Sequence, residues 1–206
     1  MALQFHPSTV QTCTPSPLGL LRLAASPNGL AGVWFDGQRH LPPRLDGADA
    51  WPHSDAHPVL QQAVQQLQQY LAGSRTRFAL PLDLGGGTPF QQAVWQALLG
   101  IGHGSVLTYG ALAAQLGRAS AVRAVAAAVG RNPLSVVVPC HRVLGAGARL
   151  TGYAGGLERK VHLLALEGVG DFGAQLRARA LAAIPGATAA MPLPETPEIP
   201  AENAPA

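Results

Sequence analysis

The sequence predicts a small α/β domain followed by a mainly helical domain, and three features support this prediction. The pair Asn28-Gly29 separates two short apolar segments, which is typical of a β-hairpin. Three consecutive glycines at 85–87 form a flexible joint in mid-chain. Beyond them, capping residues precede apolar stripes at helical spacing. We therefore expect domains at 1–86 and 87–170, with a short helix and a disordered tail rich in Ala and Pro at 171–206.

The composition restricts the class of protein. The 206 residues are 48% hydrophobic and only 12% charged, enough for sizeable cores. No apolar run approaches the length of a transmembrane helix, and no signal peptide is recognisable at the start. Two cysteines without regular spacing exclude a disulfide scaffold and favour a reducing compartment. We therefore expect a cytoplasmic protein with no membrane partner.

The predicted first domain contains a small antiparallel sheet and one helix. Two strands are expected at 18–23 and 32–35, on either side of the Asn-Gly turn. A proline-rich polar loop is expected at 41–57, and a helix at 58–72, where apolar residues recur at helical spacing. Another short strand is expected at 78–84.

The second domain begins with a helix whose start is marked by local chemistry. Thr88 caps it, Pro89 suits its first turn, and Gln91 completes a capping box. The chain ends this domain with glycine-rich turns and a helix at 157–166.

A helix-turn-helix pattern lies between these helices. Thr108 caps a predicted helix that runs to Leu116, and Ser120 caps a second that runs to about Val129. Alanines surround a single arginine, Arg123, on the second helix. Reading bases in the major groove requires polar side chains, so this helix favours contacts with groove shape and phosphates. The alternative is a buried helix packed on all sides.

The distribution of charge also points to a polyanionic partner. Residues 91–150 contain neither Asp nor Glu. A chance run in a charge-poor chain is the alternative. We expect the arginines of this block to face phosphates: Arg118, Arg123, Arg131, Arg142 and Arg149.

The segment 136–143, VVVPCHRV, carries the candidate nucleophile. Three valines predict a buried strand that Pro139 ends, because proline cannot donate to a ladder. Cys140 would then lie just past a strand end, beside His141 and Arg142. A lone cysteine is often only a small buried hydrophobe, but these neighbours favour a reactive thiol.

The segment Pro139–Val143 resembles the active-site motif of the O6-alkylguanine-DNA alkyltransferases. Other matching segments occur in that family's order and spacing, and a weaker resemblance covers 16–84. The resemblance implies a ribonuclease H-like first domain without chemistry and a winged helix-turn-helix second domain. The matching segments are Phe90–Trp95, Thr108–Gly110, Arg123–Val125, Asn132-Pro133, Gly152–Gly156 and Leu163–Gly168.

The resemblance implies direct reversal of DNA damage. O6-Alkylguanine, with O4-alkylthymine as a second candidate, would be flipped out of duplex DNA and would give its alkyl group irreversibly to Cys140, once per molecule. A relay from Cys140 through a water to His141 and Glu167 would activate the thiol. The family's further catalytic positions fall on Tyr109 and Asn132. Substrate binding is implied for Val143, Tyr153, Ala154 and Lys160, and contact with the minor groove of double-stranded DNA for Ser120, Arg123, Ala124, Ala127 and Arg131.

Taken alone, several of these residues have simpler interpretations. Glu167 would be a solvated helix end, Tyr109 a core residue, and Lys160 a solvated residue as readily as a site residue. Some family members bind structural zinc, but Cys13 is the only N-terminal cysteine here, so we expect neither zinc nor another cofactor. We also expect a monomer.

Three other functions compete with alkyl transfer. A lesion-binding protein without chemistry would lack Cys140. A transcription regulator would carry polar base-reading residues on its second helix. A cysteine hydrolase would need an oxyanion hole, for which the family match leaves no room.

Overall fold

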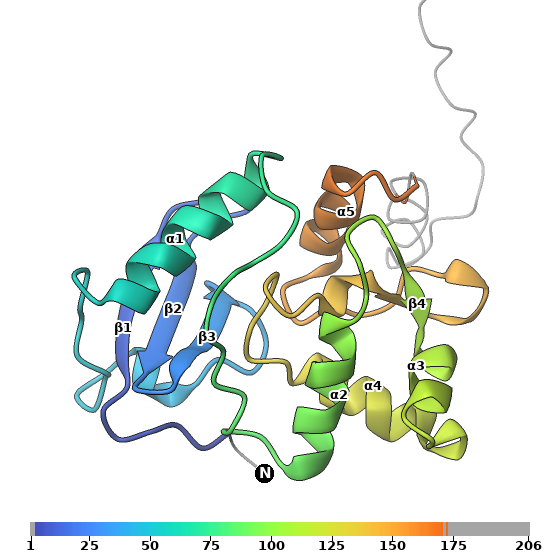
Figure 1. The fold of residues 1–206 in the computed structure, drawn as a ribbon, viewed down its shortest axis with the longest axis horizontal. Coiled ribbons are helices and arrows are strands. Elements are labelled where there is room, and N and C mark those ends of the chain that lie inside the picture. Colours follow the sequence, from blue (N-terminus) through green and yellow to red (C-terminus); the bar gives the residue numbers. More distant parts are fainter. Residues whose placement is uncertain (1–2, 171, 173–206) are drawn as a thin grey trace, which may run out of the picture.

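The computed structural model describes residues 3–170 and 172, and the chain forms two halves side by side (Figure 1). The short helix and tail predicted at 171–206 fall outside the described residues apart from Phe172. The first half holds an antiparallel sheet in the order β1-β2-β3. Its strands are β1 (Val10–Thr14), β2 (Leu21–Ser26) and β3 (Gly29–Phe35).

The hairpin between β2 and β3 confirms the prediction from Asn28-Gly29. Gly29 has a φ of 138°, and a Cβ there would come within 2.4 Å of the Pro81 carbonyl oxygen, so only glycine fits. The strand predicted at 18–23 is shifted from β2, and the strand predicted at 32–35 covers only the second part of β3. Strand β1 was not predicted from the sequence.

The predicted helix is present as α1 (Pro58–Leu71), which packs on the sheet. Leu60 and Leu67 are fully buried as the apolar spacing predicted, and Ala63 is buried beside them. The strand predicted at 78–84 is wrong. This segment makes only an isolated bridge between Leu82 and Leu30, because Pro81 has no N–H to extend a ladder.

The second half is mainly helical, as predicted. It contains α2 (Pro89–Leu99), α3 (Tyr109–Gln115), α4 (Val122–Gly130) and α5 (Leu157–Leu166). A parallel pair of two-residue strands, β4 (Leu107–Thr108) and β5 (Val143–Leu144), joins distant parts of it.

The helix starts agree only partly with the predicted caps. Thr88 and Gln91 form the expected capping box of α2, and the Thr108 side chain accepts from the Ala111 N–H at 3.1 Å. The cap assigned to Ser120 is wrong. Ser120 lies inside a 3-10 turn, η2 (Ala119–Ala121), and α4 starts after it without a side-chain cap.

The strand predicted at Val136–Val138 is also wrong. These valines are buried, but Val136 has a φ of 73°, which is left-handed and unusual for a β-branched residue. The Val138 N–H donates to the Leu134 carbonyl at 2.8 Å, and the Cys140 N–H donates to the Val138 carbonyl at 2.8 Å. The chain therefore turns repeatedly before Cys140 instead of running straight.

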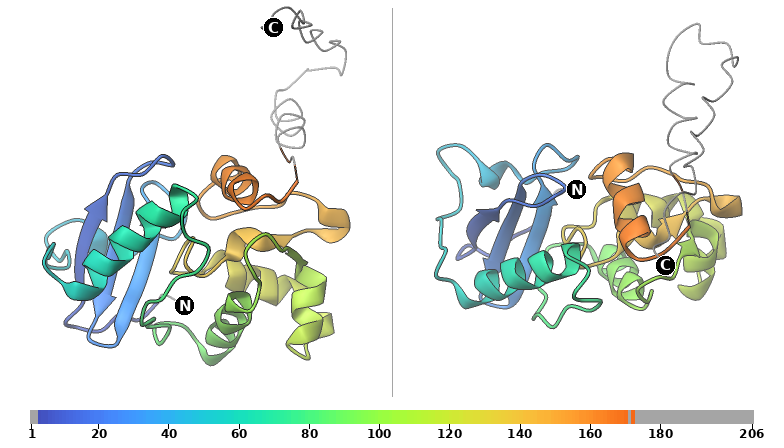
Figure 2. Two further views of the ribbon diagram at one scale, coloured as in Figure 1. Left: turned by 45° about the horizontal axis from the view of Figure 1, so that its top comes forward. Right: turned by 90° about the horizontal axis from the view of Figure 1, so that it is seen from above.

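A single cluster of buried apolar residues runs through both halves. It includes Leu23 and Val33 from the sheet and Trp95 and Val125 from the helical half, all fully buried. The further views show the sheet with α1 on one side and the other helices beside it (Figure 2). The two halves therefore position each other. Within the described residues, no helix has the length and apolar character needed to cross a membrane.

Candidate active site

Cys140 begins a buried 3-10 turn, η3 (Cys140–Arg142), and its thiol is held by Asn132. Asn132 Nδ2 lies 3.0 Å from Cys140 Sγ and 2.8 Å from the Val138 carbonyl oxygen. Asn132 Oδ1 accepts from the Leu134 N–H at 3.0 Å. Asn132 stands just beyond α4, so one amide side chain joins the end of that helix to the turn that presents the thiol.

The surroundings of Cys140 keep its thiol protonated at neutral pH. Burial raises the pKa of Cys140, while the hydrogen bond from Asn132 and the positive charge of Lys160 lower it by less. The net pKa is above the ordinary value. Because the thiolate is the reactive form, this site needs a nearby proton acceptor.

His141 and Glu167 form a fully buried pair. His141 Nε2 lies 2.8 Å from Glu167 Oε1, and both side chains have no exposed surface. Burial lowers the pKa of His141 and Glu167 raises it, with a net value below the ordinary 6.5. His141 Nδ1 has no hydrogen-bond partner among the described residues. The ring is therefore a neutral base with one nitrogen oriented by a carboxylate.

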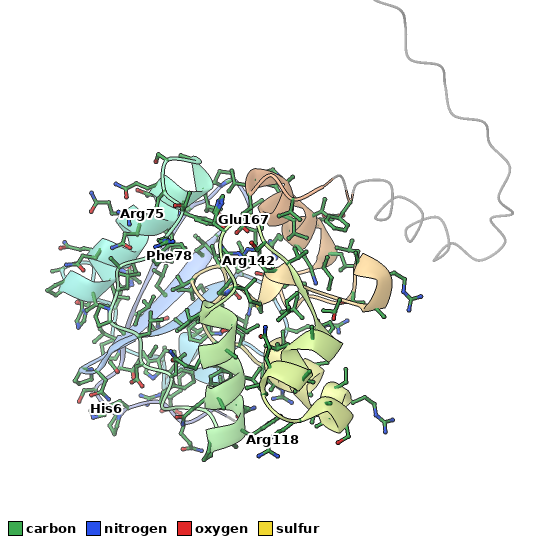
Figure 3. All side chains as sticks on the ribbon, turned by 45° about the vertical axis from the view of Figure 1, so that its right-hand side comes forward. His6, Arg75, Phe78, Arg118, Arg142 and Glu167 are labelled. Atoms are coloured by element: carbon green, nitrogen blue, oxygen red, sulfur yellow. The ribbon has the colours of Figure 1, made fainter. Side chains whose placement is uncertain are left out.

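Glu167 also binds Arg142, which corrects the expectation that Arg142 faces phosphates. Arg142 Nε lies 2.8 Å from Glu167 Oε2, and Nη2 lies 2.9 Å from Oε1. Figure 3 shows the two residues at the boundary between the halves. The Gly104 N–H (3.2 Å) and the Tyr70 hydroxyl also donate to this carboxylate. Burial raises the pKa of Glu167, but the hydrogen bonds lower it by more. The net pKa is well below the ordinary value.

Lys160 is completely buried, so its interpretation as a solvated residue is wrong. Its Nζ donates to the Val143 carbonyl at 2.6 Å and to the Thr151 carbonyl at 3.4 Å. Burial lowers the pKa of Lys160 to about 8, so most of its charge remains at neutral pH.

The two tyrosines predicted in the site are also near the thiol. Tyr109 starts α3 and Tyr153 lies in the loop before α5. Burial raises the pKa of both, and a charged Cys140 would raise them further. Ala154 lies at a position for which substrate binding was predicted. Its N–H has no acceptor among the described residues, and its carbonyl accepts from the Arg39 N–H at 3.0 Å.

Helix α4 has one exposed face, so the interpretation as a helix packed on all sides is wrong. Arg123, Ala124 and Ala127 are exposed on it, while Val125, Ala128 and Val129 are buried. Arg131 is exposed just past its end, and Ser120 just before its start. All five residues predicted to contact DNA are therefore accessible around a single helix.

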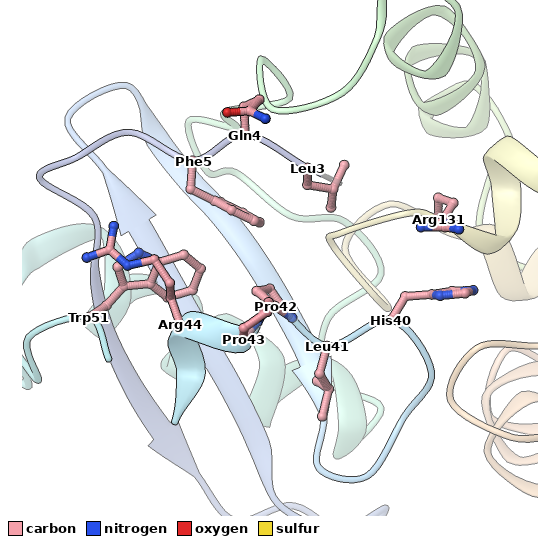
Figure 4. A pocket seen from close by; sticks show the side chains of 10 residues that line it. All are labelled: Leu3, Gln4, Phe5, His40, Leu41, Pro42, Pro43, Arg44, Trp51 and Arg131. Carbon is pink, nitrogen blue, oxygen red and sulfur yellow. The ribbon is translucent and has the colours of Figure 1, made fainter. Parts of the chain in front are cut away.

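A hollow of about 370 Å³ continues from the end of α4 toward the first half. Figure 4 shows His40 opposite Arg131 at one end, and Arg44 and Trp51 at the other. Burial lowers the pKa of His40, and the charges of Arg131 and Arg39 lower it further. The residues lining the hollow include basic side chains and no Asp or Glu.

Three contacts at Glu167 were not predicted from the sequence, those from Tyr70, Arg142 and the Gly104 N–H. Tyr70 lies on the same face of α1 as Leu60, Ala63 and Leu67, so helical spacing marks it as buried. Nothing local indicates that its hydroxyl reaches a residue 97 positions away. Among the described residues, no three His, Cys, Asp or Glu side chains gather in a group able to hold a metal ion.

Comparison with known proteins gives matches along most of the chain. Residues 9–84 match the ribonuclease-like domain, and residues 89–169 the DNA binding domain, of 6-O-methylguanine DNA methyltransferase. Methylated-DNA–protein-cysteine methyltransferases from two organisms are similar. The Mycobacterium leprae protein is 47% identical over 74% of this chain and 88% of its own length. The Mycolicibacterium paratuberculosis protein is 45% identical over 74% of this chain and 88% of its own length.

A solved structure extends the similarity to three dimensions. The crystal structure of Mycobacterium tuberculosis OGT in complex with DNA has a TM-score of 0.68 and 42% sequence identity, and the match covers 77% of this chain and 92% of that one.

Proposed function

The chain belongs to the 6-O-methylguanine DNA methyltransferase family, and from the geometry of its site we propose how it acts. It repairs alkylated DNA by moving the alkyl group from the lesion to a cysteine of its own chain. We assign that role to Cys140. The observation that carries the assignment is a buried thiol next to a buried His141–Glu167 pair.

The proposed chemistry is a displacement at the alkyl carbon. Cys140 Sγ forms the new carbon–sulfur bond, the bond between that carbon and O6 of guanine breaks, and guanine leaves. The thiol proton passes through a water to His141 Nδ1, the nitrogen that has no partner among the described residues. Glu167 holds the opposite nitrogen and stabilises the imidazolium that forms.

The remaining site residues bind and neutralise the base. The Tyr109 hydroxyl donates to guanine N3. This hydrogen bond stabilises the negative charge that develops on the leaving guanine. The Ala154 N–H donates to O6, and the carbonyls of Cys140 and Val143 accept from the exocyclic amine. Lys160 supports this arrangement, because it holds the Val143 carbonyl and places a positive charge near the thiolate. Nucleophile, proton acceptor and carboxylate all belong to this chain, so we propose a reaction without a cofactor.

We propose that double-stranded DNA binds along α4 through its minor groove. The alanines of the exposed face allow close approach, and Arg123, which has no hydrogen bond or ion pair within the described residues, would enter the stack in place of the flipped nucleotide. Ser120 and Arg131 flank the helix and would contact phosphates. We propose that the protein acts as a monomer in the cytoplasm.

A titration tests the single-use chemistry. A fixed amount of duplex DNA with one O6-methylguanine is mixed with increasing protein, and the remaining lesion is measured after the reaction stops. Because the thioether product has no route back to a thiol here, lesion loss should rise linearly and end at one lesion per protein. Continued loss at substoichiometric protein would indicate turnover. Binding without lesion loss would favour a lesion-binding protein without chemistry.

A further inference from the structure

The first half of the molecule reaches into the relay through one side chain. Tyr70 lies near the end of α1 and is 1% exposed. Its hydroxyl donates to Glu167 Oε1, the same oxygen that lies 2.8 Å from His141 Nε2. A residue outside the helical half therefore shares an acceptor atom with the proposed base.

We propose that Tyr70 is a positioning residue for alkyl transfer, whose hydroxyl holds Glu167 and weakens it as a proton acceptor, so that His141 stays neutral until it takes the thiol proton. This inference rests on the proposed function, because it assumes that His141 accepts that proton. It assigns to the first half a part in the chemistry, in addition to its support of the fold.

The physical reason is competition for the charge of one carboxylate. Donors reach Glu167 from each element around it: Tyr70 from α1, His141 and Arg142 from η3, and the Gly104 N–H from the loop before β4. Each donor stabilises the carboxylate charge and lowers its basicity. A less basic Glu167 raises the pKa of His141 by less.

The other influences on His141 act in the same direction as Tyr70. Burial lowers the pKa of His141, and the positive charges of Arg142 and Lys160 lower it further, against the effect of Glu167. If the Tyr70 hydroxyl is removed, Glu167 becomes more basic and the pKa of His141 rises. A larger fraction of His141 is then protonated, and unable to accept a proton, at slightly acid pH.

A purely structural role would depend on the ring of Tyr70 instead of its hydroxyl. The ring packs 5.2 Å from that of Phe78 and 6.2 Å from that of His103, measured between centroids. Phenylalanine at position 70 keeps these contacts. The variants Tyr70→Phe and Phe78→Leu therefore separate the hydrogen bond from the packing.

The test is the pH dependence of single-turnover alkylation by free O6-benzylguanine, which requires no DNA binding. In Tyr70→Phe, the midpoint of the acid limb should move to higher pH by about half a unit or more. Phe78→Leu should keep the wild-type midpoint. In a Glu167→Gln background, Tyr70→Phe should cause no further shift, since the carboxylate that carries the effect is absent.

A midpoint that stays in place or moves to lower pH in Tyr70→Phe would overturn the proposal, as would an equal shift in Phe78→Leu. If Tyr70→Phe unfolds at acid pH, replacement of Tyr70 by 3-fluorotyrosine gives an independent test. Its more acidic hydroxyl is a stronger donor, so the midpoint should move to lower pH, and any other result overturns the proposal. A wild-type protein that removes no methyl group from duplex DNA with O6-methylguanine would contradict the proposed function instead.

Discussion

Replacement of Glu167 by glutamine should damage both stability and chemistry, by different routes. The change removes a buried negative charge that accepts from Arg142 at 2.8 and 2.9 Å and from His141 at 2.8 Å. Arg142, 7% exposed, is left with its charge unpaired. Removing one partner of a buried ion pair costs about 3–5 kcal/mol. In a chain of this size that corresponds to a fall in melting temperature of about 10 °C.

The stability difference should depend on pH with a defined sign. The pKa of Glu167 in the folded protein lies well below its ordinary value of 4.5, so the carboxylate stabilises the fold fully above that value. This contribution is lost as the pH falls below 4.5 toward the pKa of the folded state. The wild type and Glu167→Gln should therefore differ most at neutral pH and converge in acid, as measured by denaturant unfolding.

Alkyl transfer by Glu167→Gln should slow by about tenfold to a hundredfold, because the variant loses part of the rate enhancement that general base catalysis provides. Without the carboxylate, the pKa of His141 falls further and the thiol proton has a poorer acceptor. Free O6-benzylguanine and duplex lesions should slow together, and higher pH should restore part of the rate as the thiol ionises unaided. The matched control is Glu158→Gln, which changes an exposed glutamate in the first turn of α5, the helix that Glu167 follows. Unchanged rates would show that Glu167 is only structural.

Two further substitutions test the rest of the site. Arg123→Ala should react normally with free O6-benzylguanine but at least about tenfold more slowly with the same lesion in duplex DNA. The reason is that no side chain then fills the gap left by the flipped base, so the cost of unstacking is not offset. Equal slowing with both substrates would show that Arg123 has only a structural role. Lys160→Met should slow both substrates at neutral pH by about tenfold for each unit that the pKa of Cys140 rises, because it removes a positive charge near the thiolate. A thiol titration that shows the same pKa in both proteins would contradict the role of Lys160.

The elements predicted correctly are those whose causes are local. The capping box of Thr88 and Gln91 and the cap at Thr108 lie within three residues of the groups they bind. The Asn28-Gly29 hairpin is equally local. By contrast, the three valines at Val136–Val138 indicated burial, and this was wrongly interpreted as a β-strand. The valines are buried as expected, but the backbone there forms turns.

The contact between His141 and Glu167 was predicted, but the other partners of that carboxylate were not. The motif around Cys140 and His141 is contiguous, and the resemblance supplied Glu167. The partners Tyr70 and Arg142 at that carboxylate depend on contacts across 97 and 25 residues, which no periodicity records. Arg142 was therefore expected to face phosphates, although its charge serves a buried carboxylate. The same long-range packing turned Lys160 inward.

Peptide mass spectrometry after reaction with O6-methylguanine DNA tests the assignment of the nucleophile most directly. The peptide that contains Cys140 should gain the mass of one methyl group, in proportion to the lesion lost, and the peptide that contains the exposed Cys13 should gain none. Cys140→Ser should bind the damaged duplex and gain no methyl group. Methylation of Cys13, or of any other residue in Cys140→Ser, would contradict the assignment.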